Sequence, residues 1–214
     1  MSWESTKNIV QMPKGNFRSI LGYAGESLAI GRALICGYTL FFKAWRDAKC
    51  DAVLDAKGTL FRLEIKHTAT RILSTSQGER SGAQINRDVA PRGRPISTDD
   101  CDFVLGIESL KGRCWIIPVE IVEILDRKTL AFYFLSHFEE KWGIFMFSNQ
   151  NICNTLIKKG FSTLSDIELD SICSSLGLVV PPESIIRIGQ RTKVSLTPRN
   201  WKIINIWLCI YDSL

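Results

Sequence analysis

The spacing of apolar residues predicts an α/β protein whose first half runs from one helix into several strands. Apolar side chains recur at helical intervals over residues 19–36, and Gly37 is suited to end that helix. Short apolar or alternating runs then predict strands over residues 38–42, 52–54, 60–66, 103–107 and 114–119. We expect the last two of these strands to pair with each other.

A different pattern begins near residue 120 and predicts a mainly helical second region. A short helix is predicted over 121–125, and strands over 130–135 and 144–147. Two later helices carry clear start signals. Ser165 and Glu168 have the spacing of a capping box, and Gly177 is placed to end the helix that follows them.

The last helix of the chain is predicted to begin at Thr197, with Pro198 in its first position. Its sequence is apolar on nearly all sides. Such a helix is normally buried, so we expect it to pack against the body of the protein or against a second subunit.

The composition fits a folded chain with one sizeable core. The 214 residues are 45% hydrophobic and 23% charged, which excludes collagen-like, low-complexity and wholly disordered proteins. No apolar run approaches the roughly 20 residues of a membrane span, and the N-terminus has no apolar stretch typical of a secretory signal. The seven cysteines are scattered without a CxxC pair. We therefore expect reduced thiols and a cytoplasmic location.

A predicted β-hairpin brings acidic and basic side chains together. Side chains alternate along the strand 60–66, so its apolar residues face the core while Glu64 and Lys66 share the other face. If Lys57 and Gly58 form the loop, Asp51 falls directly opposite Glu64, with Cβ atoms about 5 Å apart. Two carboxylates and an ammonium therefore converge on one small patch.

The carboxylates of Asp51 and Glu64 would repel each other at this spacing unless a positive charge lies between them. A hard divalent cation removes the conflict, and Mg²⁺ is the usual choice beside a phosphate substrate. Such a cation polarises a phosphoryl oxygen and activates water, while a nearby lysine stabilises developing negative charge. The pattern therefore indicates metal-dependent phosphodiester hydrolysis.

Asp51 together with Glu64-Ile65-Lys66 resembles the motif of the PD-(D/E)xK nuclease superfamily. Glu26, which lies in the predicted first helix, matches the acidic residue that many members place before the motif. The resemblance covers roughly residues 20–120 and extends to resolvase-like and group I intron-encoded nucleases and to type II restriction endonucleases. Cys50 stands where the motif often has proline.

The resemblance implies a restriction-endonuclease-like αβββαβ core with a mixed central sheet. We expect this core in residues 1–148, followed by a mainly helical C-terminal elaboration over 149–214 for recognition or dimerisation. The implied catalytic residues are Glu26, Asp51, Glu64 and Lys66. Asp51 and Glu64 would hold Mg²⁺, with Glu26 as a further candidate ligand, and Mn²⁺ is expected to substitute.

Each of these residues also has a simpler explanation. A lone Glu-x-Lys pair on a surface strand usually belongs to a solvated face, and Glu26 can merely flank an apolar helix stripe. Asp47 and Asp55 are rivals of Asp51, although Asp55 would lie at the turn. The combination of the motifs favours the nuclease. His67 points to the opposite face of its strand, which favours a structural histidine.

A polar segment over residues 70–100 is the predicted DNA-facing region. Such a long stretch in a compact domain is more often functional than idle, although a solvated loop is the alternative. Arginine reads guanine in the major groove, and glutamine or asparagine reads adenine. The predicted DNA-binding residues are Arg71, Arg80, Gln84, Asn86, Arg87, Arg92 and Arg94.

The leading functional prediction is a Mg²⁺-dependent, sequence-specific endonuclease that cleaves double-stranded DNA like a type II restriction enzyme and acts as a homodimer. A structure-selective Holliday-junction resolvase and an intron homing endonuclease are the alternatives among nucleases. An inactive, nuclease-derived DNA-binding protein is the non-enzymatic alternative. The formal net charge of +5 permits a polyanionic partner without requiring one.

Overall fold

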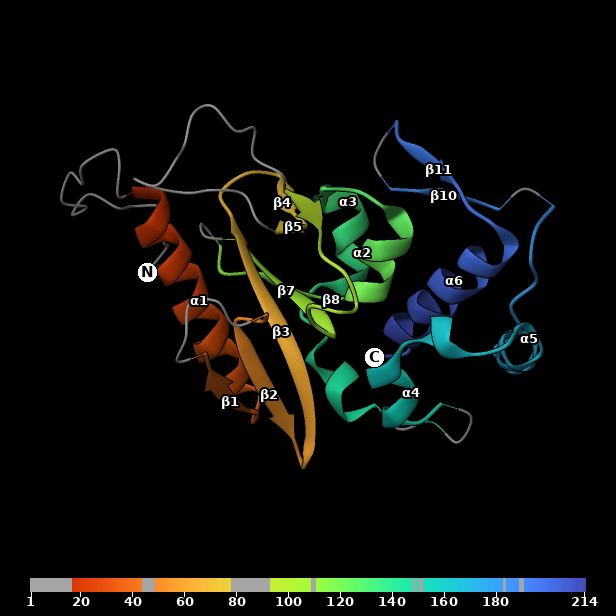
Figure 1. The fold of residues 1–214 in the computed structure, drawn as a ribbon, viewed down its shortest axis with the longest axis horizontal. Helices are drawn as coiled ribbons and strands as arrows, with labels where there is room; N and C mark the ends of the chain where they lie inside the picture. The colour runs from red at the N-terminus through yellow and green to blue at the C-terminus, as the bar shows by residue number, and fades with distance from the viewer. Residues whose placement is uncertain are drawn as a thin grey trace.

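A five-stranded mixed sheet lies at the centre of the fold (Figure 1). In spatial order its strands are β1 (Thr39–Phe42), β2 (Ala52–Ala56), β3 (Thr59–Thr68), β7 (Phe103–Glu108) and β8 (Cys114–Pro118). Within this sheet β3 and β7 run parallel, and the other neighbours are antiparallel. The computed structural model describes residues 17–43, 49–77, 93–108, 111–147, 149, 152–182, 184–188 and 191–214.

The hairpin between β2 and β3 has the predicted register. Lys57 and Gly58 form the loop with φ angles of 52° and 91°, the left-handed pair that a two-residue hairpin turn requires. The side chain of Asp55 accepts a hydrogen bond from the Gly58 amide at 2.6 Å. Ala56 consequently pairs with Thr59, and every later pair of the ladder follows from that one.

Helix α1 (Phe17–Ile35) packs against β1, β3 and β7, beside which it lies in Figure 1. Its small residues Ala29 and Ala33 are fully buried, which allows the helix to approach the sheet closely. The chain leaves the helix through Gly37, whose φ of 85° is unfavourable for residues with a Cβ. The predicted first helix and its end are therefore confirmed.

Short elements fill the region between β3 and β7 and the region after β8. They are β4 (Ile72–Ser74), β5 (Ser76–Gln77), β6 (Arg94–Pro95), α2 (Val119–Leu125), β9 (Thr129–Ala131), α3 (Phe132–Leu135), and the 3-10 helices η1 (Ser136–Phe138) and η2 (Trp142–Met146). Strand β4 pairs with β9, and β5 with β6, both antiparallel. Helix α2 occupies the position at which the sequence predicts a helix.

Two predicted strands in this region are wrong. Strand β9 covers little of residues 130–135, which continue as helix α3, and residues 144–147 lie largely in the 3-10 helix η2. The neighbours Ile144 and Phe145 are both buried. A helical turn directs consecutive side chains into the core, whereas a strand would direct one of them away from it. Short apolar runs do not distinguish these two cases.

The remainder of the chain is mainly helical, as predicted. Its elements are α4 (Asn154–Lys159), the 3-10 helix η3 (Phe161–Thr163), α5 (Asp166–Ser175), the hairpin β10 (Ile185–Arg187) and β11 (Lys193–Ser195), and α6 (Pro198–Asp212). Both hydrogen bonds of the predicted capping box between Ser165 and Glu168 are present. Thr197 caps α6 through its side chain.

Helix α6 is buried against the body of the protein. Trp207 packs edge-to-face on Phe103 of β7 and on Phe161. The hydroxyl of Tyr211 donates a hydrogen bond to the carbonyl of Ile116 in β8 at 2.6 Å. One continuous hydrophobic core therefore includes the central sheet and the last helix.

The cysteines and the helices of the described part of the chain bear on the sequence-based expectations as well. All seven cysteines lie there, and all are free thiols. None of the described helices combines the length and apolar character needed to cross a membrane.

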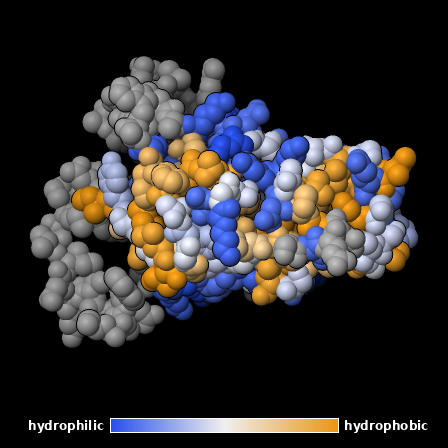
Figure 2. All heavy atoms as spheres, turned by 90° about the horizontal axis from the view of Figure 1, so that it is seen from below, coloured by the Kyte–Doolittle hydropathy of each residue, from blue (hydrophilic) through white to orange (hydrophobic). Residues whose placement is uncertain are grey.

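Several apolar side chains remain on the surface at one edge of the sheet. Leu34 and Ile35 at the end of α1, and Phe41 and Phe42 of the outer strand β1, are all exposed. Apolar atoms gather over this end of the molecule at the left of Figure 2. We call these four residues the β1 edge patch.

Candidate active site

Asp51 comes directly before β2, where the pairing with β3 departs from the predicted register. The amide of Asp51 donates to the carbonyl of Leu63 at 2.9 Å, although Leu63 is the ladder partner of Ala52. Two residues therefore face one at this point, which is a bulge, and it displaces the predicted pairing of Asp51 with Glu64. One carboxylate oxygen of Asp51, Oδ2, accepts a hydrogen bond from the amide of Ile65 at 2.9 Å. The side chain is thus fixed over β3, beside the Glu-x-Lys segment.

Glu64 and Lys66 form an ion pair on one face of β3. The Lys66 Nζ lies 2.6 Å from Glu64 Oε1. The Glu64 residue is only 6% exposed, although a Glu-x-Lys pair on a solvated face would leave it in water. A buried carboxylate with a charged partner is costly to maintain, and such groups concentrate at functional sites.

Glu26 reaches the site from helix α1. Its neighbour Gly25 lies against His67 of β3, and a Cβ added at Gly25 would come within 2.6 Å of the His67 Cβ. Glycine at this position therefore permits the close approach of helix and strand that brings Glu26 near Asp51. His67 packs under α1, which agrees with the predicted structural role of this histidine.

Lys43 is a site residue that the sequence-based reasoning missed. Its amide donates to the carbonyl of Asp51, which extends the pairing of β1 with β2 by one residue. Its Nζ also forms an ion pair with Asp51 Oδ1. Lys43 and Asp51 are therefore neighbours where β1 and β2 meet. The signal for Lys43 was its position just after the strand 38–42.

Burial and mutual repulsion raise the pKa of two of the carboxyls. For Glu64, burial is the largest cause, and Lys66 opposes it while Asp51 adds to it. For Glu26, burial and then the charge of Asp51 raise the pKa, opposed by Lys43 and Lys66. Burial lowers the pKa of Lys43, but its hydrogen bond to Asp51 and the charges of the three carboxylates outweigh burial and raise it. The five groups therefore act as one electrostatic cluster.

The cluster offers two paired carboxylates rather than a closed metal cage. In the described ranges, no group of three histidine, cysteine or acidic side chains is arranged to hold a metal ion. Asp51 and Glu64 are nevertheless the donors that Mg²⁺ accepts, because this ion commonly takes one or two carboxylates and completes its shell with water and substrate phosphate. The residues present therefore fit such an ion in the presence of a phosphate substrate.

Two of the seven predicted DNA-binding residues are described. Arg71 is exposed in the bend between β3 and β4. Arg94 forms a two-pronged ion pair with Asp100, which together with Ser97 lowers the pKa of Asp100 to about 2. The other five lie outside the described residues, namely Arg80, Gln84, Asn86, Arg87 and Arg92.

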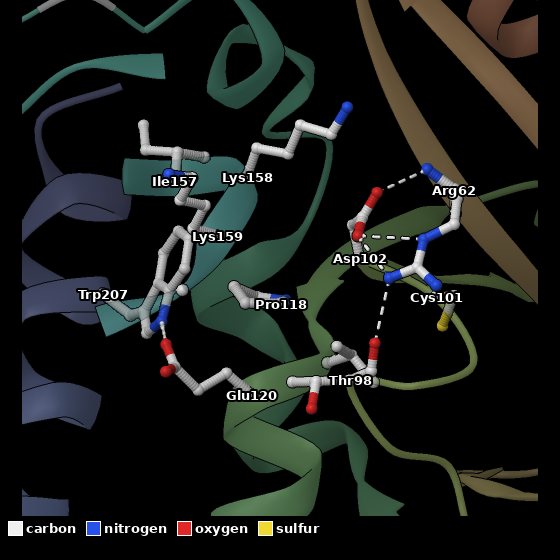
Figure 3. Close-up of a pocket in the computed structure, with 12 residues that line it drawn as sticks. Arg62, Thr98, Cys101, Asp102, Pro118, Glu120, Ile157, Lys158, Lys159 and Trp207 are labelled. Atoms are coloured by element: carbon white, nitrogen blue, oxygen red, sulfur yellow. Dashed lines mark hydrogen bonds and ion pairs between the residues drawn. The ribbon is translucent and has the colours of Figure 1, made fainter. Parts of the chain in front are cut away.

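A cavity of about 170 Å³ lies near this site, between the sheet and the C-terminal helices (Figure 3). Asp102, in its wall, accepts a hydrogen bond from the guanidinium of Arg62 at 2.8 Å. Glu120, in the same wall, accepts a hydrogen bond from the indole of Trp207 at 2.7 Å. Since both carboxylates are paired, and none of the predicted catalytic residues lines this cavity, we assign it to packing.

Comparison with known proteins adds little to this picture. No family model matches the chain, and no curated protein matches it. The solved structure of a bacterial homing endonuclease, I-Ssp6803I, superimposes with a TM-score of 0.42 over 53% of this chain and 76% of its own, at 16% sequence identity. A likeness at this level does not establish a shared fold, so we base the function on the residues of the site.

Proposed function

We propose that the chain is a metal-dependent endonuclease that hydrolyses phosphodiester bonds of double-stranded DNA, with the chemistry of the PD-(D/E)xK nucleases. The observation that carries this proposal is the placement of Asp51 beside the Glu64-Ile65-Lys66 segment, with Lys66 paired to Glu64 and Glu26 supplied by α1. The same residues carry the sequence motif of that superfamily. Motif and placement therefore support one another.

Each residue of the cluster has a role in the proposal. Asp51 and Glu64 hold Mg²⁺, or Mn²⁺ in its place, and Glu26 is a further candidate ligand. When bound, the cation polarises the phosphate and activates water. Lys66 stabilises negative charge that develops on the phosphate or orients the water. Glu26, with its raised pKa, is suited to accept a proton near the site.

Cleavage of a specific duplex sequence, as by a type II restriction enzyme, belongs to the same proposal. The predicted DNA contacts follow β3 directly in the chain, and the exposed position of Arg71 suits such a contact. The αβββαβ core and the recognition role of residues 149–214 are likewise proposed. The helices of that part pack on the sheet, so they can add to the surface that meets DNA.

A homodimer is also part of the proposal. A duplex has two strands of opposite direction, and each chain supplies one cluster of the kind described above. The β1 edge patch supports self-association, because apolar side chains that gather on a surface commonly mark an interaction site.

Cleavage assays with the full chain test the proposal. In Mg²⁺, wild-type protein should cut linear duplex DNA of varied sequence into discrete bands, and EDTA should stop the reaction. Asp51→Asn and Glu64→Gln should each lower the cleavage rate by at least about a hundredfold, because each removes a carboxylate from the cation site. Binding of the same DNA, measured by fluorescence anisotropy, should persist in both variants.

Asp55→Asn is the matched control, because Asp55 lies in the same hairpin and makes its hydrogen bond at the turn. This variant should cut at the wild-type rate. Cuts confined to a four-way junction would replace the restriction assignment with a junction resolvase. DNA binding without any cleavage would contradict the enzyme and favour the inactive binding protein.

A further inference from the structure

The ammonium of Lys43 is bound to the carboxylate of Asp51, which the proposed function assigns to the cation. Its Nζ contacts Asp51 Oδ1, while Asp51 Oδ2 is engaged by the amide of Ile65. Glu64, the partner carboxylate, is engaged at Oε1 by Lys66. Each of the two proposed ligands is therefore held by a lysine ammonium.

The two lysines are placed differently. Lys66 is part of the Glu-x-Lys segment, and its charge lies beside Glu64 on the same strand. Lys43 comes from the end of the outer strand β1, and its side chain is 30% exposed, against 11% for that of Asp51. A partly exposed ammonium at the edge of the sheet can move into water while the stem of its side chain stays packed on the protein.

The charges of the cluster show how Lys43 would affect a divalent cation. Glu26 and Glu64 each interact electrostatically with Asp51 and with both lysines, and Asp51 interacts with Lys43. With all groups ionised, three carboxylates and two ammonium groups leave a net charge of −1. A divalent cation that enters beside Lys43 meets an ammonium of the same sign, and it must share or take the Asp51 oxygen that Lys43 holds.

We propose that Lys43 is a displaceable counter-ion of the cation site: it neutralises Asp51 while no divalent cation is bound and weakens cation binding to the protein alone. This inference rests on the proposed function, which assigns Asp51 and Glu64 to the cation. Lys43 thereby keeps a buried pair of carboxylates compatible with the folded state. The expected consequence is that removal of its charge strengthens cation binding.

Titration of Mn²⁺ alone into the full chain without DNA, followed by calorimetry, tests this inference. Lys43→Gln keeps a hydrogen-bond donor near Asp51 but removes the charge, and Lys43→Met removes both. Both variants should bind Mn²⁺ about fivefold more tightly than wild type, the scale expected when one partly exposed charge pair is lost. Lys43→Arg, which keeps the charge, should bind like wild type.

The direction of the change separates this role from a structural one. If Lys43 only positioned Asp51 for the cation, its removal would weaken Mn²⁺ binding, and unchanged or weaker binding in both variants overturns the inference. Lys57→Met, in the hairpin turn, controls for the loss of one positive charge elsewhere and should leave the affinity unchanged.

Asp51→Asn shows which of the two proposals has failed. Loss of Mn²⁺ binding in Asp51→Asn, together with no gain in the Lys43 variants, overturns the role of Lys43 and leaves the cation site intact. Wild-type affinity in Asp51→Asn contradicts the cation site itself. Absence of binding in both wild type and Lys43→Gln also overturns the inference.

Discussion

Glu64 and Glu120 are both buried at the central sheet, and their partners differ in kind. Glu120, at the start of α2, is 3% exposed and accepts hydrogen bonds from the amides of Phe161 and Ser162 and from the indole of Trp207. Glu64, in β3, is 6% exposed and is held by the ammonium of Lys66.

The two kinds of partner hold the two carboxylates differently. Neutral donors from the backbone and an indole fix Glu120 in one position, so it connects α2 to η3 and α6. The ammonium of Lys66 is a partner that a cation can replace, and burial, together with the charge of Asp51, raises the pKa of Glu64. Burial alone therefore does not distinguish the two, whereas the chemistry of the partner does.

The largest effect that this comparison predicts is on stability, at Glu120. In Glu120→Gln the amide group of the new side chain would face N–H donors, leaving at least one of the three donors without an acceptor. We expect the free energy of unfolding to fall by about 3 kcal/mol, measured by urea denaturation.

The control for this prediction lies on the same helix. Glu123 is exposed and accepts one hydrogen bond, from the amide of Thr98 at 3.1 Å. Glu123→Gln can keep that bond and should change stability by less than about 0.5 kcal/mol. Equal effects of the two substitutions would contradict the structural role of Glu120.

The position of the third carboxylate, that of Glu26, depends on the packing of α1 against β3 rather than on a bonded partner. Gly25→Ala would place a Cβ within 2.6 Å of the His67 Cβ, so helix and strand must separate. We expect a loss of about 2 kcal/mol in the free energy of unfolding. The cleavage rate should also fall, because Glu26 moves away from Asp51.

Gly31→Ala is the matched control in the same helix, since a Cβ there meets no atom within 4 Å. Alanine is the better helix former, so this variant should gain up to about 1 kcal/mol. A Gly25→Ala protein that is as stable and active as Gly31→Ala would show that close packing of α1 is not needed.

The sequence predicted Asp51, Glu64 and Lys66 as one cluster because a two-residue turn determines their register. Once Lys57 and Gly58 form the loop, only one pairing of the two strands remains. Lys43 could not be found in this way, because residues 43–51 separate β1 from β2 and a connection of that length leaves several registers open.

Contacts between residues far apart in the sequence explain the other features that the sequence did not predict. The three donors that satisfy Glu120 follow it by 41, 42 and 87 positions, so no local pattern announces them. The wrong strands at 130–135 and 144–147 have the same origin. Their short apolar runs were predicted as strands, but the surrounding structure decided that Phe132–Leu135 and Trp142–Met146 would be helical.

The smallest predicted effect concerns the pH dependence of stability at Glu64. Because its pKa is raised above 4.5 in the folded protein, the folded state binds more protons than the unfolded state at pH values between the two. The ionised carboxylate therefore costs stability above the raised pKa. At neutral pH, Glu64→Gln should be more stable than wild type, by on the order of 1 kcal/mol, and the gap should close as the pH falls toward 4.5.

Asp100 provides a control of opposite sign. Its ion pair with Arg94 lowers its pKa from 3.8 to about 2, so its contribution to stability is present above pH 3.8 and is lost as the pH falls toward 2. Asp100→Asn should thus be less stable than wild type at neutral pH, by about 1 kcal/mol once the exposure of Arg94 is allowed for. Thermal melts of both variants from pH 3 to pH 8 measure the two gaps. If Glu64→Gln instead lost stability at neutral pH, as Asp100→Asn is expected to, the ionised Glu64 would stabilise the fold. Glu64 would then be a structural carboxylate like Glu120.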